Sequence, residues 1–289
     1  MEPVFLLPGE GETISDRAER TVRINADVEP VVVTESRYAS GERGPKPHVH
    51  HRHTDAFWVL EGALVFEVGH EREHVQAEAG TFAAVPANVV HTFWNDGPAE
   101  ARFLNVHAPG GRFGEYMRAM RDDRPDPGFD SDDPPEDGGP SAAEAVVRPA
   151  DAGETLTLGP ARVTFKLESS DRGGTFSLTD TFVPAGFAGP VPHVHERFFD
   201  CFYVLEGALT LRLDDRVAEA PAGTFVLIPP GTVHTFSNTR AETARILNLM
   251  APGGFEGYLR EVVAASAGAP PDRALMTEIA SRHDFHPVA

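Results

Sequence analysis

Apolar and polar residues along most of the chain follow the pattern of short strands. The runs AFWVLEGALVFEV, from residue 56, and CFYVLEGALTLRL, from residue 201, are rich in aromatic and β-branched residues and are each interrupted by a glycine. Shorter apolar runs, GTFAAVP from residue 80 and GTFVLIPPG from residue 223, are bounded by glycine and proline. These residue types favour strands, and glycine and proline favour the turns between them. The pattern predicts an all-β sandwich or barrel.

Three segments have apolar residues at helical spacing instead. Two of them, residues 113–123 and 255–266, follow the sequence Ala-Pro-Gly-Gly, and the third covers residues 272–285 near the C-terminus. We expect a short helix in each segment, because proline and glycine commonly stand next to helix ends.

The strand pattern occurs twice, because the chain repeats itself. His48 recurs 145 residues later as His193, and His91 recurs 143 residues later as His234. The matches extend from the N-terminal region to the helix that follows Ala-Pro-Gly-Gly. A period of this length indicates a duplicated domain rather than a solenoid of short repeats.

The repeat predicts two domains joined by a linker. We place an N-terminal barrel at residues 1–121 and a C-terminal barrel at residues 146–289. Residues 122–145 between them are rich in Asp, Pro and Gly and have no apolar periodicity. Such a segment buries too little apolar surface to order itself, so we expect a solvated linker.

Charge and composition narrow the class of protein. The 289 residues carry a net charge of −19, and 41% of them are hydrophobic. A strongly acidic chain is a poor partner for nucleic acid or for an anionic membrane, since both require a basic face. Cys201 is the only cysteine, so no intrachain disulfide forms. The N-terminus lacks the basic region of a signal peptide, and we expect a cytoplasmic protein.

Each copy contains a set of residues suited to a metal ion. His48 and His50 are one residue apart, as are His193 and His195, so each pair projects from one face of a strand. Asp55 or Asp200 follows, and His91 or His234 lies further along. Three imidazoles and a carboxylate suit Mn, Fe, Co, Ni, Cu or Zn in the divalent state. The lack of thiolate ligands argues against a structural zinc site.

In each copy these residues lie in two segments, which are residues 47–62 and 80–95 in the first copy and residues 192–207 and 223–238 in the second. The segments resemble the two sequence motifs of the cupin superfamily, G-x5-H-x-H-x3,4-E-x6-G and G-x5-P-x-G-x2-H-x3-N. Both halves of the chain carry the resemblance, which makes the protein similar to bicupins such as quercetin dioxygenases. It implies two tandem cupin (double-stranded β-helix, jelly-roll) barrels with short helices after each. It also implies one divalent metal per barrel, held by the following residues: His48, His50, His91, His193, His195 and His234.

The sequence departs from these motifs in two ways. Aspartate, as Asp55 and Asp200, replaces glutamate in both copies, so the carboxylate reaches the metal weakly or serves as a catalytic base nearby. Asn88 replaces glycine in the first copy. That position is expected in a turn with positive φ, which asparagine tolerates better than other residues with a side chain.

The other histidines receive no metal role. Register excludes His51 and His53, which we expect at the surface or the rim of the barrel. His107 falls where the second copy has Met250, which argues against a shared metal role. The remaining histidines have no partner in the repeat and are expected to be solvated: His70, His74, His283 and His286.

Strand parity also predicts the lining of the pocket. Phe57 and Phe202 lie two residues after the aspartates, and Phe93 and Phe236 lie two residues after the third histidine of each set. If the ligands point into the barrel, these four phenylalanines do too, unless they simply fill the core. An apolar cavity beside a metal suits a hydrophobic or aromatic substrate with an enol, phenol or carbonyl oxygen.

Three functions remain open at this point. The leading one is a metal-dependent dioxygenase that uses O₂, with Asp55 or Asp200 as the catalytic base. The second is a non-oxidative isomerase, cyclase, lyase or decarboxylase with the metal as Lewis acid. The third is a non-catalytic small-molecule binding protein. The fold alone does not decide among them. Both a monomer and a homodimer are compatible with two barrels in one chain.

Overall fold

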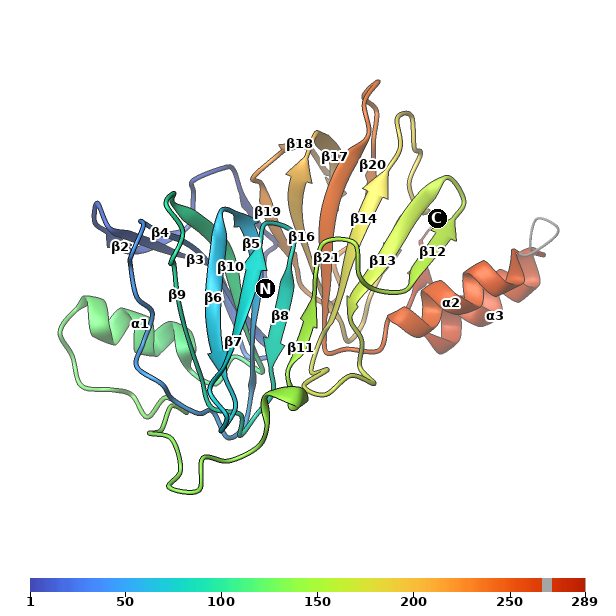
Figure 1. Ribbon diagram of the computed structural model, residues 1–289. Coiled ribbons are helices and arrows are strands. Elements are labelled where there is room, and N and C mark those ends of the chain that lie inside the picture. The colour runs from blue at the N-terminus through green and yellow to red at the C-terminus, as the bar shows by residue number, and fades with distance from the viewer. Residues whose placement is uncertain (267–271, 289) are drawn as a thin grey trace. The chain divides into compact units, whose positions relative to one another are not determined.

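The computed structural model describes residues 1–266 and 272–288 and consists mostly of antiparallel strands (Figure 1). Its chain divides into two compact units. The first barrel comprises Glu10–Ala152 and Ser170–Thr175, and the second comprises Met1–Gly9, Gly153–Ser169 and Phe176–Ala289. Each unit contains two sheets, so the prediction of two tandem all-β barrels is confirmed.

The first barrel is built from a sheet of seven strands and a sheet of three. In spatial order, the larger sheet contains β11 (Val146–Arg148), β8 (Phe82–Val85), β5 (Thr54–Glu61), β10 (Ala101–Ala108), β4 (Val31–Tyr38), β3 (Arg20–Val28) and β2 (Glu12–Asp16). The smaller one contains β7 (Glu73–Glu78), β6 (Ala63–Val68) and β9 (His91–Trp94). Alternate residues of these strands point inward, and Phe57, Phe66 and Phe103 form the centre of an aromatic core.

The second barrel repeats this plan with a larger second sheet. The first sheet contains β1 (Val4–Leu6), β19 (Phe225–Ile228), β16 (Phe199–Glu206), β21 (Ala244–Ala251), β14 (Ser177–Val183), β13 (Ala161–Leu167) and β12 (Thr155–Leu158). The second contains β18 (Arg216–Pro221), β17 (Ala208–Leu213), β20 (His234–Ser237), β15 (His193–Val194) and β22 (His286–Pro287).

The described residues contain three α-helices, and all three lie where the apolar spacing predicts them. They are α1 (Phe113–Arg121), α2 (Glu256–Ala265) and α3 (Arg273–Arg282) (Figure 1). Phe113 and Met117 form the buried side of α1, and Arg118 on the same helix binds both carboxylate oxygens of Glu12. None of the helices is long and apolar enough to cross a membrane.

The two units exchange their first strands, which the predicted boundaries did not anticipate. β1, at the start of the chain, pairs with β19 in the second barrel, where Val4 is opposite Leu227. β11, at the start of the second copy, pairs with β8 in the first barrel, where Val146 is opposite Ala84. The two pairings are equivalent, because β1 and β11, like β8 and β19, are copies of one strand in the repeat.

Residues 122–145 belong to the first barrel. Most of them are exposed, but Phe129, Asp130 and Ala142 are buried, so the expectation of a solvated linker is wrong at these positions. Asp132 forms a two-way backbone bridge with Val49, between the first two histidines of the motif. The segment contains only a short 3₁₀ helix, η1 (Ala142–Glu144), and the isolated bridge at Asp132, so it has no extended apolar periodicity and single buried residues hold it in place.

Candidate metal centres

The first barrel brings four of the predicted site residues together. His48 and His50 lie on an extended segment before β5, Asp55 lies in β5, and His91 is the first residue of β9. The backbones of His48 and His91 form a bridge, with N–O distances of 3.1 and 2.9 Å. One ligand atom from each of the four residues lies within 4.8 Å of the others. Such a set of atoms is compact enough to surround one metal ion.

Backbone carbonyls orient the three imidazoles of this set. Nδ1 of His48 lies 2.9 Å from the carbonyl oxygen of Lys46, and Nδ1 of His91 lies 3.1 Å from that of Val89. Nδ1 of His50 lies 2.5 Å from the carbonyl oxygen of Asp130. A proton on each Nδ1 leaves the Nε2 lone pair of each ring available to a metal, as in known metal sites.

Asp55 is a buried carboxylate surrounded by hydrogen-bonding groups. Its Oδ2 lies 3.1 Å from Nε2 of His91, and the side-chain amide of Asn105 donates to its Oδ1. Burial by itself raises the pKa of Asp55. The nearby rings of His107, His50 and His91 outweigh burial and hold this pKa well below its usual value. The carboxylate therefore stays ionised and supplies a negative charge beside the three histidines.

The second barrel assembles His193, His195 and His234 in the same way. One ligand atom from each lies within 4.8 Å of the others. Their Nδ1 atoms lie 2.9, 2.6 and 3.0 Å from backbone carbonyl oxygens of Val191, Asp284 and Thr232, respectively. Asp200 stands next to this set, with Oδ2 at 3.3 Å from Nε2 of His234.

Both sets fit a divalent transition metal. Burial, followed by the neighbouring histidines, lowers the pKa of His48 and of His193 to about 3, so both rings are neutral at pH 7. Nε2 of His50 and of His234 is buried, and neither has a hydrogen-bond partner within the described part of the chain. A buried polar atom without a partner is rare and calls for an explanation, which a metal ion at the centre of each set provides.

Asn88 has the backbone conformation that the sequence predicts. Its φ is 71°, and the equivalent Gly231 has a φ of 86°. In both turns the backbone N–H donates to the backbone carbonyl oxygen of the second histidine of the pair, at 2.6 Å for His50 and 2.8 Å for His195. The substitution of asparagine for glycine therefore preserves the turn that supports the histidines.

The prediction for His53 is wrong. Its side chain is 1% exposed, and its Nδ1 lies 3.2 Å from a carboxylate oxygen of Asp130. His107 is buried as well, and together with His50 these two rings form another histidine cluster of the first barrel. The spacing to Asp55 excludes His53 from the motif, but it says nothing about Asp130, which lies far along the chain. The sequence carried one signal that these two histidines differ from the repeat: the equivalent positions of the second copy are Phe198 and Met250, both apolar.

The other extra histidines differ in exposure. His51, His70 and His74 are exposed, as we expect from the sequence. His283 and His286 are partly buried, because Nε2 of His283 lies 2.8 Å from Glu261 and Nε2 of His286 lies 3.1 Å from Asp284. The expectation that these two histidines are solvated therefore holds only in part.

Asp130 and Asp284 were missed by the sequence analysis and are equivalent in the two barrels. Each accepts hydrogen bonds at its carboxylate from two backbone N–H groups just after the His-x-His pair. Each also accepts a hydrogen bond at its backbone carbonyl from the second histidine. They lie 154 residues apart, off the period of the repeat, because α3 is inserted before Asp284. An aromatic residue beside each aspartate was the only sequence signal.

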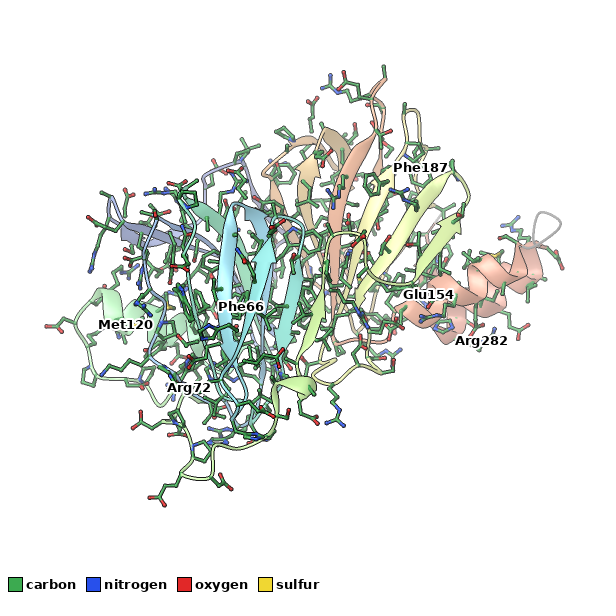
Figure 2. The ribbon with its side chains drawn as sticks, in the orientation of Figure 1. Phe66, Arg72, Met120, Glu154, Phe187 and Arg282 are labelled. Atoms are coloured by element: carbon green, nitrogen blue, oxygen red, sulfur yellow. The ribbon has the colours of Figure 1, made fainter. Side chains whose placement is uncertain are left out.

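A cavity of about 600 Å³ leads to the ligands of the first barrel. Phe93 lines it, as predicted. Phe57 does not, since it is fully buried against Phe66 and Phe93 (Phe66 is labelled in Figure 2), with ring centroids 4.9 Å apart in both cases. Strand parity predicts that the side chain of Phe57 points into the barrel, but not that other core side chains fill the barrel at this level. The aromatic residues that do line the cavity are Tyr38, Phe93, Phe103, Phe113, Tyr116 and Phe129.

In the second barrel, aromatic residues cover the equivalent histidines. The ring of Phe285 stacks on His193, with centroids 4.0 Å apart and planes 18° apart. Phe285 belongs to a buried cluster with Tyr258 and Phe255 from the helical region. Phe202 is buried in the barrel core, and Phe236 packs against that core. His193 is 4% exposed, whereas His48 in the first barrel is partly exposed.

Comparison with known proteins agrees with this architecture. The family model described as "Cupin domain" matches residues 34–107 and 180–250, so the chain belongs to the cupin family and carries two copies of the domain. It is therefore a bicupin.

Among individual proteins, the chain is similar to quercetin 2,3-dioxygenase of Bacillus subtilis (strain 168), with 26% identity over 121 residues. This match spans 42% of the chain and 35% of the length of that enzyme.

Among solved structures, it resembles the protein Ylba of E. coli, with a TM-score of 0.63 and 13% identity, covering 86% of this chain and 90% of that one. Oxalate decarboxylase of Bacillus subtilis gives a TM-score of 0.61 at 12% identity and covers 87% and 78% of the two chains. At such identities these structures support the fold alone.

Proposed function

We propose that the protein is a metal-dependent enzyme whose working centre lies in the first barrel. In this proposal it is a dioxygenase that acts on a hydrophobic or aromatic enol or phenol. The observation that carries the proposal is the cavity of about 600 Å³, which has aromatic walls and contains His48, His50 and Asp55. The similarity of a 121-residue segment of the chain to a quercetin 2,3-dioxygenase supports the same class of substrate.

The charged groups at the cavity favour a largely neutral substrate over a small dianion. Arg20 lines the cavity, but its guanidinium group already binds Glu42 at 2.7 Å and lies over the ring of Tyr38 at 4.6 Å. Lys46 also lines the cavity, but the carboxylates of Asp55, Asp132 and Asp133 outnumber it there. A dianion would meet these carboxylates, whereas a planar aromatic substrate would contact the ring faces.

His48, His50 and His91 would hold the metal, with Asp55 beside it. A bound metal supplies Lewis-acid activation of the substrate oxygen and, for a redox-active ion, reaction with O₂. Asp55 is ionised, so its Oδ2 is able to accept the proton of the substrate hydroxyl group. Asn105 holds the other oxygen of the carboxylate in place, and aromatic side chains form much of the cavity wall around it.

We propose that the second barrel holds a metal without turning over substrate. The stacking of Phe285 on His193 supports this, because a substrate would have to displace a buried aromatic ring. The duplicated ligand set would then be kept for stability, since a bound metal stabilises a fold that brings its ligands together.

The test is turnover by the metal-reconstituted protein. We would measure O₂ consumption and products for flavonols, catechols and aliphatic enols, with each of Mn, Fe, Co, Ni and Cu. The variants are His91→Ala, its matched control His234→Ala, and Asp55→Asn. We expect O₂ uptake that His91→Ala and Asp55→Asn abolish and His234→Ala retains.

Other outcomes would contradict parts of the proposal. Product formation without O₂ uptake would favour a non-oxidative lyase or isomerase. Loss of activity only in His234→Ala would place the reaction in the second barrel. Tight binding of these compounds without turnover, with metal in both barrels, would make the protein a binding module.

A further inference from the structure

The first barrel contains a buried pair of histidines that the second barrel lacks. Nε2 of His53 lies 3.0 Å from Nδ1 of His107, and the two residues are 1% and 2% exposed. The equivalent positions in the second barrel are Phe198 and Met250. Two buried polar rings in contact are unusual in a core, and here they occur in the barrel with the open cavity.

One member of this pair, His107, contacts Asn105, which donates a hydrogen bond to Asp55. Nε2 of His107 lies 3.1 Å from Oδ1 of Asn105. The other end of the same amide, Nδ2, donates to Oδ1 of Asp55 and to the carbonyl oxygen of Ala56. The amide of Asn105 is therefore held at both ends.

The second barrel holds the equivalent amide differently. Nδ2 of Asn248 donates to Asp200 at 2.5 Å and to the carbonyl oxygen of Cys201 at 3.2 Å. The side chain two residues later is Met250, whose sulfur lies 4.0 Å from the same Nδ2. A thioether does not donate a hydrogen bond, so it cannot fix the oxygen of the amide.

Packing keeps the histidine pair in place. Phe113, the first residue of α1, stacks on His107 with centroids 3.6 Å apart and planes 25° apart. The ring of His53 stacks on that of His50 at 4.1 Å, and Asp130 contacts its Nδ1 at 3.2 Å. The carboxylate of Asp130 also accepts backbone hydrogen bonds from His51 and Arg52, so it is anchored independently of His53.

We propose that His53 and His107 are positioning residues of the first centre: they fix the amide of Asn105 and, through it, the direction in which Asp55 presents its carboxylate to the cavity. This inference rests on the proposed function in one respect, namely that Asp55 accepts the substrate proton. It requires His107 to donate from Nε2 to Oδ1 of Asn105. Nδ1 of His107 then accepts a hydrogen bond from Nε2–H of His53. Nδ1 of neutral His53 has no proton in this arrangement, so its contact with the carboxylate of Asp130 is not a hydrogen bond, and the stacking on His50 holds the ring.

Variants that carry the second barrel's own residues test this role. They are His107→Met and His53→Phe, because the second barrel shows that a cupin core accommodates methionine and phenylalanine at these positions. His107→Gln is the conservative variant, since glutamine keeps a donor and an acceptor. His74→Met, at an exposed histidine, is the control.

We expect kcat of His107→Met to fall by about 10- to 100-fold, the usual effect of removing a partner of a metal-site residue, with KM changed less than about twofold. His53→Phe should show a smaller fall, and His107→Gln should recover part of the loss. With Co(II) in both barrels, the absorption bands of the first centre should change in His107→Met while the metal content stays the same. Those of the second centre, identified in His91→Ala, should not change.

A measurement on the metal-free protein is independent of turnover. The ¹⁵N chemical shifts of the ring nitrogens should show His107 protonated at Nε2 and a slowly exchanging Nε2–H on His53. Protonation of His107 only at Nδ1 would overturn the inference, as would unchanged kcat and cobalt spectra in a folded His107→Met variant. If the wild-type protein turns over none of the substrates, the proposed function fails, while the nitrogen shifts and cobalt spectra still decide the positioning role.

Discussion

The backbone carbonyl oxygen of Asp130 lies 2.5 Å from Nδ1 of His50. This contact connects a segment outside both histidine motifs to the ring of a candidate metal ligand. The carboxylate of the same residue caps the backbone N–H groups of His51 and Arg52. Burial by itself raises the pKa of Asp130, but these two N–H groups outweigh it and lower that pKa below its usual value. A charged, anchored residue thus fixes the ligand's ring.

Asp130→Ala should weaken metal binding in the first barrel by about 10- to 100-fold. The variant keeps the backbone carbonyl that orients the ring of His50, but it loses the carboxylate that anchors this carbonyl to the N–H groups of His51 and Arg52. Asp284→Ala is the matched variant and should weaken the second barrel by a similar factor. Competition with a chelator, followed as a two-site titration, measures both affinities. Equal weakening of both centres by either variant would show a general loss of structure rather than a local effect.

The metal-free protein should lose stability as the pH falls from about 6.5 to about 3. The pKa of His48 and of His193 is about 3 in the folded state and 6.5 without the fold. Between these values the unfolded chain binds more protons than the folded one, so acid favours unfolding. Each histidine contributes at most about 1.4 kcal/mol per pH unit in this window.

Urea unfolding of the metal-free protein at several pH values measures this slope. His48→Gln should reduce it, since glutamine does not titrate, and exposed His70→Gln should leave it unchanged. A slope that is the same in wild type and in His48→Gln would refute the assignment.

Asn88 should be replaceable by glycine but not by alanine. Its positive φ disfavours residues with a Cβ, and the amide oxygen of Asn88 also contacts His51 at 2.8 Å. Asn88→Ala should lower the free energy of unfolding by about 1–2 kcal/mol, the usual strain of left-handed backbone, whereas Asn88→Gly should change it little. Gly231→Ala is the control, because a Cβ at that position meets no atom within 4 Å and adds backbone strain alone. Thermal or urea unfolding decides, and equal losses for glycine and alanine at position 88 would contradict the expectation.

Phe285→Ala should uncover the second centre without removing its metal. The ring of Phe285 is buried between His193 and Tyr258, with centroid distances of 4.0 and 4.8 Å. Its loss should cost about 3 kcal/mol or more of stability. Azide should then bind to Cu(II) or Co(II) in the second barrel, as seen by a new absorption band. His234→Ala combined with Phe285→Ala should abolish that band, and a band already present in the wild type would show that Phe285 does not block access.

The strands, the helices and the groups of ligands were predictable because they depend on local spacing. Alternation places His48 and His50 on one face, and the copy of this spacing at His193 and His195 removes the ambiguity that His51 and His53 introduce. The turn at Asn88 was also predictable, because few residue types tolerate positive φ.

The surroundings of the ligands were not predictable, because they depend on contacts between distant segments. His53 meets Asp130 across 77 residues, and His107 meets His53 across 54. Phe57 shows a different limit, since strand parity gives the side of a sheet on which a residue lies but not whether that level of the barrel is filled.

The reciprocal exchange of β1 and β11 makes each copy of the repeat depend on the other. The first strand of each copy completes the larger sheet of the other copy. Two separate chains that exchanged their first strands in this way would form a domain-swapped homodimer. Within one polypeptide the two histidine sets need not be identical: His53 and His107 adjoin only the first, and Phe285 covers the second.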